Sequence, residues 1–258
     1  MMKRVFAIIM LAFVAVTTSA QEVEEIEFTA DRPGASTGTG VVGRNVFQWE
    51  QGIAYDGDGA KGQFTFSNTL FRFGLFDGVE LRLGGDALIH HDGAKWHPAF
   101  SGLSVGTKIR CFEGRGAIPA ISLMANLAIP GTGSRGFAPE NVAPSLYLLF
   151  DNPVNDWFSI GYNVGVEWDG ALIGPSTFVA LCLGFSITER LGCFAESFNY
   201  FSRYGDCYGV DFGFNYMVAE RVQLDLAANL NDLTHVAHAW SVSCGVAWQI
   251  NNPTKRKR

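Results

Sequence analysis

Hydrophobic and polar residues alternate along most of this chain, in stretches of roughly ten residues between positions 45 and 250. The stretch at residues 79–90 reads VELRLGGDALIH. Successive side chains of a strand point to opposite faces, so this pattern predicts strands with one apolar and one polar face. Repeated around a closed sheet, the pattern is typical of a β-barrel that spans an outer membrane.

We expect an all-β fold, a closed antiparallel transmembrane β-barrel of about 12 strands. The predicted strands cover residues 45–55, 64–75, 79–90, 100–112, 117–129, 142–150, 157–168, 176–187, 192–202, 207–218, 222–230 and 238–250. Alternation does not assign the faces of residues 192–202, because three aromatic residues share a face with Glu196.

The breaks between the strands alternate in length. Short breaks fall at residues 76–78, 113–116, 151–156, 188–190 and 219–221. Mostly longer breaks fall at 56–62, 91–99, 130–141, 169–175, 203–206 and 231–237. Short periplasmic turns and longer outer loops are typical of outer-membrane barrels, and an even strand number returns both termini to the periplasmic side.

The chain begins as an export signal does. A basic Lys3-Arg4 pair precedes an apolar run and the small residues of a cleavage site, which we place after Ala20. We predict a signal peptide at 1–20, an irregular periplasmic or lumenal segment at 21–43, the barrel at 44–250 and a basic periplasmic tail at 251–258. No later apolar run approaches the ~20 residues that a spanning helix needs.

Composition supports a lipid-facing surface. Only 17% of the residues are charged, against ~25% in soluble domains, and aromatic residues gather at the predicted strand ends as interfacial girdles do. The expected partners are the lipid bilayer, lipopolysaccharide, the outer-membrane assembly machinery and a small-molecule substrate. A net charge of −6 argues against nucleic acid. The predicted location is the outer membrane of a Gram-negative bacterium.

Charged residues on the polar faces are the candidate functional residues. A charge that faces lipid costs ~2–4 kcal/mol near the midplane, so these side chains should point into the lumen. The candidates that line it are Glu50, Arg72, Glu80, Arg82, Asp86, Lys108 and Arg110. They either pair across strands and fill the interior, or line a polar path in which the four cations form a basic strip. Asp31 and Arg32 are a candidate plug, the alternative being a flexible periplasmic lead.

The sequence contains no catalytic, cofactor or metal motif in a context that would support its function. Residues 131–136 fit G-x-G-x-x-G, but Pro139 and Pro144 exclude the helix that a phosphate site needs. Residues 102–106 fit G-x-S-x-G, but they lie inside what we expect to be a continuous strand, where a nucleophile elbow cannot form. The five cysteines have no metal-type spacing and are expected to be free. We predict no catalytic residue, no cofactor and no metal site.

Several short motifs resemble a known family. They are TADRPG at 29–34, STG at 36–38, FQWEQG at 47–52, NTLFRFGL at 68–75 and VELRL at 79–83. They are similar to the opening of a transporter-like outer-membrane family linked to the meta-pathway of phenol degradation. Members share a T-D-R-P opening, split here by Ala30, and a Q-x-E-x-G first strand. This chain departs from many barrels by ending in a polar, basic tail instead of an aromatic residue.

We therefore expect a barrel for passive transport of small molecules, and not an enzyme. The family resemblance implies hydrophobic or aromatic substrates. One alternative is an outer-membrane enzyme that modifies lipid, for which Ser104, His90 and Asp86 are the only near candidates. The other alternative is a structural barrel with a filled lumen.

Overall fold

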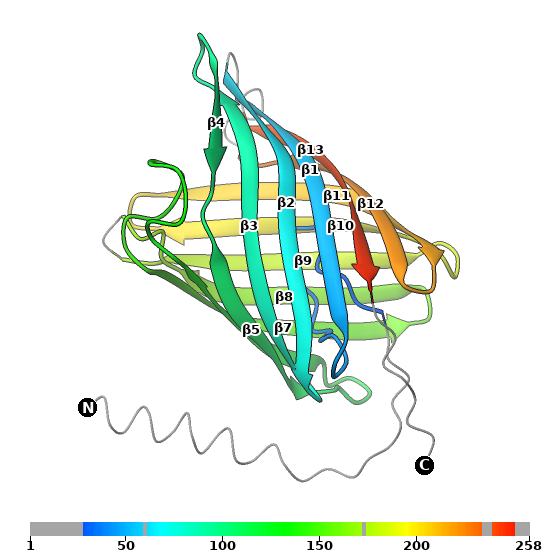
Figure 1. Ribbon diagram of the computed structural model, residues 1–258. Helices are drawn as coiled ribbons and strands as arrows, with labels where there is room; N and C mark the ends of the chain where they lie inside the picture. Colours follow the sequence, from blue (N-terminus) through cyan, green and yellow to red (C-terminus); the bar gives the residue numbers. More distant parts are fainter. Residues whose placement is uncertain (1–27, 59–60, 172–173, 234–238, 251–258) are drawn as a thin grey trace, which may run out of the picture.

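The described part of the computed structural model has thirteen β-strands, which form a closed wall (Figure 1). The structure describes residues 28–58, 61–171, 174–233 and 239–250, so the predicted signal peptide and basic tail lie outside the described residues. The strands are β1 (Phe47–Asp58), β2 (Lys61–Phe76), β3 (Val79–His91), β4 (Trp96–Phe100), β5 (Ser104–Phe112), β6 (Ala120–Ala128), β7 (Ala143–Asn155), β8 (Phe158–Glu167), β9 (Ser176–Ser186), β10 (Leu191–Ser202), β11 (Gly205–Ala219), β12 (Val222–Leu230) and β13 (Trp240–Gln249).

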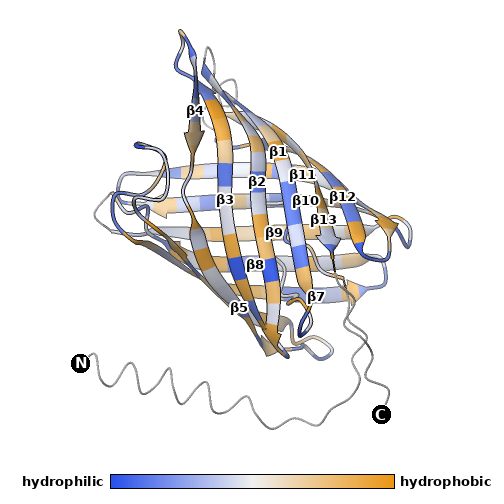
Figure 2. Ribbon diagram, in the orientation of Figure 1, coloured by the Kyte–Doolittle hydropathy of each residue, from blue (hydrophilic) through white to orange (hydrophobic). Residues whose placement is uncertain are grey.

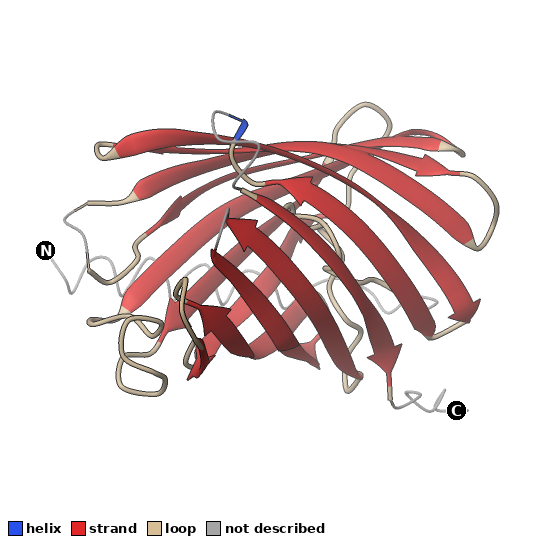
Figure 3. Ribbon diagram, turned by 90° about the horizontal axis from the view of Figure 1, so that it is seen from above, coloured by secondary structure: helices blue, strands red, loops and turns tan. Residues whose placement is uncertain are grey.

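The sheet closes between its first and last strands. β1 and β13 pair antiparallel from Gln48 opposite Gln249 to Gly57 opposite Trp240. Apart from β4, each strand pairs antiparallel with its neighbours in the sequence, and β4 and β5 both pair with β3. The barrel therefore has twelve strands around its wall and one extra strand, which confirms the predicted fold class. Figure 3 shows the wall from above.

The wall contains one interruption that the sequence pattern did not predict. We expected a continuous strand at 100–112, but β4 ends at Phe100 and β5 begins at Ser104. Gly102 between them has a φ of 91°, a left-handed conformation that breaks an extended ladder. The loop after β6 bonds to the break instead, since the Leu103 amide donates to Thr132 Oγ1 at 2.8 Å.

Three of the predicted longer breaks are wrong, because strands extend into them. β4 begins at Trp96, inside the break predicted at 91–99. β1 and β2 pair as far as Asp58 opposite Lys61, so two residues separate these strands. β10 and β11 pair as far as Ser202 opposite Gly205, again with two residues between them. The predicted long breaks after β6 and β8 do form, at 129–142 and 168–175.

The two faces of the wall differ in polarity. Along β12, Leu224 and Leu226 are exposed on the outer face, whereas Gln223 and Asp225 are buried inside the barrel. Figure 2 shows the same alternation of apolar and polar positions on β1, β2 and β3. Among the described residues there is no helix with the length and hydrophobicity of a membrane-spanning helix.

The structure assigns the faces of β10. Glu196 and Phe198 are both buried, while Ala195 and Phe201 are exposed on the outer face. Phe198 packs with Phe178 and Ala180 of β9, and Tyr147 and Tyr200 extend this cluster. Aromatic side chains therefore fill part of the lumen beside β7, β9 and β10.

Candidate functional site in the lumen

Residues 29–43, which precede β1, pass through the interior of the barrel (Figure 1). They begin at Thr29, whose carbonyl oxygen accepts hydrogen bonds from Gln48 and Arg72 at 2.7 and 2.9 Å. They then contact β12, β11, β10, β8, β7 and β6 in turn, and return to β2 and β3. We call residues 29–43 the plug segment.

Asp31 of the plug segment lies among three cations from the wall. Its carboxylate is 2.5 Å from Arg82 Nη1, 2.7 Å from Lys108 Nζ and 3.5 Å from Arg72 Nη1. Burial alone would raise the pKa of Asp31, but Arg72, Lys108 and Arg82 outweigh burial and hold that pKa well below its ordinary value. Asp31 therefore carries its charge throughout the physiological pH range.

Two carboxylates from the wall complete this cluster. Arg72 is 2.9 Å from Glu50 and 2.8 Å from Glu80, and the three side chains are almost fully buried. The Asp31 backbone amide also donates to Glu50. Three cations thus face three anions, which removes most of the cost of burying each charge.

Arg32 anchors the plug segment to β12 and β2, the strands on either side of the paired β1 and β13. Its guanidinium is 3.1 Å from Asp225 of β12 and donates to Asn68 of β2 at 2.8 Å. The guanidinium lies against Gly52 and Gly245, which are paired across β1 and β13. A Cβ at Gly52 would stand 2.1 Å from Arg32 Nη1, so only glycine leaves room for it.

The middle of the plug segment meets two carboxylates on β10 and β11. The amide and hydroxyl of Ser36 both donate to Glu196, the amide at 2.7 Å. The amide of Ala35 donates to Asp211 at 3.2 Å. Glu196 and Asp211 are paired across the two strands, and neither forms an ion pair within the described part of the chain.

Polar side chains of β6, β7 and β8 hold the next residues. Asn163 accepts from the Thr37 amide at 2.7 Å and donates to the Thr37 carbonyl at 2.9 Å. Asp151 accepts from both the amide and the hydroxyl of Thr39, at 2.6 and 2.8 Å. Ser122 donates to the Thr39 carbonyl at 2.7 Å. The backbone of the plug segment is therefore satisfied by side chains of the wall, as a strand partner would satisfy it.

The structure brings most of the residues singled out from the sequence to the lumen. Those around Asp31 are Glu50, Arg72, Glu80, Arg82 and Lys108. Asp86 lies elsewhere on the inner wall, where Asn68 donates to it at 2.8 Å. Arg110 stands apart at the end of β5, 3.5 Å from Glu113.

Sequence reasoning missed several residues that hold the plug segment, among them Asp151 and Glu196. Asp151 lies within β7 and not in the short break where the pattern placed it. Glu196 lies on the strand whose faces the pattern left unassigned. An acidic residue within an otherwise apolar strand was the available signal for both.

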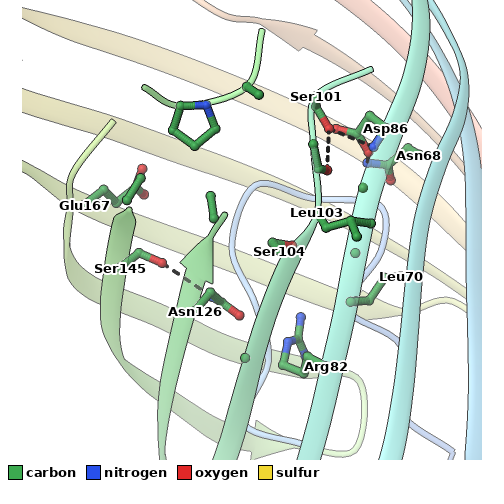
Figure 4. A pocket seen from close by; sticks show the side chains of 18 of the residues that line it. Asn68, Leu70, Arg82, Asp86, Ser101, Leu103, Ser104, Asn126, Ser145 and Glu167 are labelled. Carbon is green, nitrogen blue, oxygen red and sulfur yellow. Dashed lines mark hydrogen bonds between the residues drawn. The ribbon is translucent and has the colours of Figure 1, made fainter. Parts of the chain in front are cut away.

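A cavity of about 710 Å³ lies between the plug segment and the loops at the far end of the barrel (Figure 4). Asp31, Arg32 and Thr37 of the plug segment line it on one side. The wall and loop residues that line it include Leu70, Arg82, Asp86, Leu103, Ser104, Asn126, Phe137, Tyr147, Glu167 and Trp168. A second cavity of about 90 Å³ shares Thr37, Tyr147 and Glu167 with the first. The lumen thus holds an empty space of the size that small-molecule sites have.

The residues of the alternative, enzymatic hypothesis do not form a catalytic set. Ser104 and Asp86 line the cavity, but no hydrogen bond joins Ser104, His90 and Asp86 in the described ranges. His90 instead packs against the rings of His97 and Phe137. Nor do the described residues include a group of three or more His, Cys, Asp or Glu able to hold a metal ion.

Solved structures of outer-membrane channels share this fold. An outer membrane channel from Pseudomonas putida F1 matches with a TM-score of 0.62 and 9% identity, over 88% of this chain and 99% of that chain. The KdgM porin matches with a TM-score of 0.55 and 9% identity, over 79% of this chain and 99% of that chain. The NanC porin matches with a TM-score of 0.54 and 7% identity, over 78% of this chain and 100% of that chain.

No curated protein matches the sequence. A family model does match, over residues 30–235, and its description is "Putative MetA-pathway of phenol degradation". The match spans the plug segment and nearly all of the barrel. The chain therefore belongs to the family described as "Putative MetA-pathway of phenol degradation", as the motifs in the plug segment and the first strand predict.

Proposed function

We propose that the chain is an outer-membrane channel through which small molecules pass passively, and that the plug segment closes it. The outer membrane of a Gram-negative bacterium is its proposed location, reached through the signal peptide expected at residues 1–20. Hydrophobic or aromatic molecules are its proposed substrates, in line with the family description and the resemblance in sequence. It is not an enzyme in this proposal.

One observation carries the proposal, namely that the cavity ends on the plug segment and not on the barrel wall. Asp31, Arg32 and Thr37 line the cavity, and none of them belongs to a strand. The wall is hydrogen-bonded to itself from β1 to β13 without the plug segment. Removing the plug segment would therefore leave the closed sheet in place and extend the cavity along the lumen.

The charges described above hold the closed state. Arg72, Arg82 and Lys108 do not form an unpaired strip, because Asp31, Glu50 and Glu80 neutralise them. Passage of solute through the lumen therefore requires the plug segment to move.

Conductance in planar bilayers tests the channel. The full chain is compared with a variant that lacks Asp31 to Gly40, and with an Asp92→Asn control in an exposed loop, which keeps every contact of the plug segment. We expect the deletion to produce steady conductance that the full chain and the control lack. A deletion variant that inserts as a folded barrel and still does not conduct would contradict the proposal and favour a structural barrel with a filled lumen.

Uptake measurements test the substrate class separately. Vesicles with an outer leaflet of lipopolysaccharide slow the diffusion of apolar solutes, so a channel for them becomes measurable. We expect the protein to accelerate entry of labelled phenol more than entry of labelled glycerol. Equal acceleration of both solutes would contradict a hydrophobic or aromatic substrate class while leaving passive transport in place.

A further inference from the structure

Only half of the Arg82 guanidinium is used by the plug contacts. Its Nη1 donates to Asp31 at 2.5 Å and to Glu80 at 2.7 Å. Its Nε has no hydrogen-bond partner, and no described residue bonds to Nη2. The Arg82 side chain is only 9% exposed, and it lines the 710 Å³ cavity. A buried guanidinium with free donors is a position where an acceptor is missing.

The neighbours of Arg82 leave those donors uncovered. Its partner across the sheet on β5 is Gly106, and the next position on the same face of β3 is Gly84. Neither glycine has a side chain that could bond to the guanidinium, although the Asn126 carboxamide occupies the space over Gly106, with its Oδ1 2.2 Å from where a Cβ would stand. Figure 4 shows Arg82 at the base of the cavity, below Ser104 and beside Leu70.

The free edge of a guanidinium has a defined chemistry. Nε and Nη2 carry N–H groups that point in parallel, and they match the two oxygens of a carboxylate. The contacts through Nη1 fix the Arg82 side chain where it lines the cavity; Nη2 is the accessible donor of this edge, and Nε lies buried beside it. We propose that Arg82 is a carboxylate-binding site inside the cavity, and that its ligand is a small monocarboxylate with an apolar body.

The remaining lining selects a single negative charge. Six carboxylates line the cavity against the two guanidinium groups of Arg32 and Arg82, and two of the six, Asp86 and Glu167, form no ion pair within the described ranges. A second carboxylate on the ligand would therefore meet like charge. Leu70, Leu103 and Phe137 offer apolar surface to the rest of the ligand.

This inference rests on the cavity of the proposed function and names a substrate class for it. It does not require transport, because binding at Arg82 is an equilibrium property of the closed barrel. Conductance and binding therefore fail independently of each other. A barrel that binds the carboxylate and never conducts would overturn the proposed function and leave the site at Arg82 standing.

Calorimetric titration of the purified full chain in detergent tests the ligand class. The probes are hexanoate, 1-hexanol and hexanedioate, which share a six-carbon body and differ in charge. We expect hexanoate to bind at least about tenfold more tightly than either of the others. Equal affinity for hexanoate and 1-hexanol would overturn the proposal, because the site would then read only the apolar body.

Two variants assign the binding to the free edge of Arg82. Arg82→Lys keeps the positive charge beside Asp31 and Glu80 but has no parallel N–H pair, so hexanoate affinity should fall about tenfold. Gly84→Glu leaves Arg82 in place and brings a tethered carboxylate to its free edge, so hexanoate binding should be lost. Gly84→Gln is the matched control, and it should bind hexanoate more tightly than Gly84→Glu does.

A Cβ at Gly84 would lie 3.1 Å from Ser104 Oγ and 3.3 Å from the Thr69 carbonyl, so both Gly84 variants require the Ser104 and Thr69 neighbours to shift by a few tenths of an ångström. Retained amide protection of the plug segment shows that each variant is folded and closed. Hexanoate binding that is unchanged in folded Arg82→Lys, or that is equal in Gly84→Glu and Gly84→Gln, would overturn the assignment.

Discussion

Two walls of one lumen hold the plug segment by different chemistry. On the β2, β3 and β5 wall, the charged side chain of Asp31 meets Arg72, Arg82 and Lys108. On the β7 to β11 wall, backbone amides of the plug segment donate to carboxylates and to an asparagine. One wall therefore recognises a particular residue, and the other recognises an extended backbone.

The two kinds of contact differ in how strongly they hold the plug segment and in how far they depend on its side chains. A buried ion cluster depends on every member, because the loss of one leaves an uncompensated charge. Hydrogen bonds to backbone amides are individually weaker, and they tolerate changes of side chain in the plug segment. Substitutions on the two walls should therefore loosen the plug segment by different amounts, which amide hydrogen exchange of residues 35–42 can measure.

Asp31→Asn should have the largest effect. It leaves Arg72, Arg82 and Lys108 with one counter-charge too few, which costs about 3–5 kcal/mol. Protection of the Thr39 and Val42 amides should fall by two to three powers of ten, since each ~1.4 kcal/mol is a factor of ten. Asp92→Asn in an exposed loop is the matched control and should leave protection unchanged. A loss in Asp31→Asn no greater than in that control would remove the distinction between the walls.

Asn163→Leu should have an intermediate effect. The substitution leaves both the amide and the carbonyl of Thr37 without their partner on β8, which costs about 1–3 kcal/mol. Hydrogen exchange at the Thr37 amide reports this loss directly. Asn199→Leu lies on the outer face of β10 and should not change it. If Asn163→Leu exceeded Asp31→Asn, backbone recognition would be the stronger hold.

Ser36→Ala should have a smaller effect. It removes the hydroxyl that donates to Glu196, while the Ser36 amide still donates to the same carboxylate. The expected cost is about 0.5–1.5 kcal/mol, measured as faster exchange of the neighbouring amides. Ser197→Ala, on the other face of β10, serves as the control. A cost above that of Asn163→Leu would show that this wall recognises side chains of the plug segment and not its backbone.

Mild acid should have the smallest effect. The folded pKa of Asp31 lies below its unfolded value of ~3.9, so its stabilisation is complete above that unfolded value and is lost as pH falls through the folded pKa. Protection of residues 38–42, corrected for the intrinsic exchange rate, should thus stay constant from about pH 8 to about pH 5. Release of these residues near pH 6 would show that a group other than Asp31 controls the plug segment.

The sequence predicts the wall well because alternation is a local property. The alternation of polar and apolar positions alone turns Arg72, Arg82 and Lys108 inward. In the structure Arg72 and Lys108 are fully buried, and the Arg82 side chain is 9% exposed. The alternation of polarity does not distinguish the two faces of a strand where the inside of the barrel is itself apolar. In β10, Phe198 and Tyr200 turn inward with Glu196 to pack beside Phe178, so polarity does not mark the faces there.

The sequence predicts an irregular segment at 21–43 and singles out only two of its residues as a candidate plug. Asp31 and Arg32 attract notice because of their charges, but the path of residues 35–42 depends on backbone contacts that no side-chain pattern encodes. The motif at 29–34 and the first-strand motif at 47–52 contact each other. Gln48 and Glu50 of the first strand bond to Thr29 and Asp31, and Gly52 makes room for Arg32.

A disulfide cross-link tests most directly whether the plug segment occupies the lumen. All five native cysteines are free, and Cys182 on β9 is paired with Glu196, the residue to which the Ser36 amide and hydroxyl donate. Ser36→Cys is combined with serine at the four other native cysteines, and peptide mapping follows mild oxidation in membranes. The account predicts nearly complete cross-linking to Cys182, and none when Cys182 is also serine. A thiol at position 36 that stays reduced and reacts freely with a bulky maleimide would contradict it.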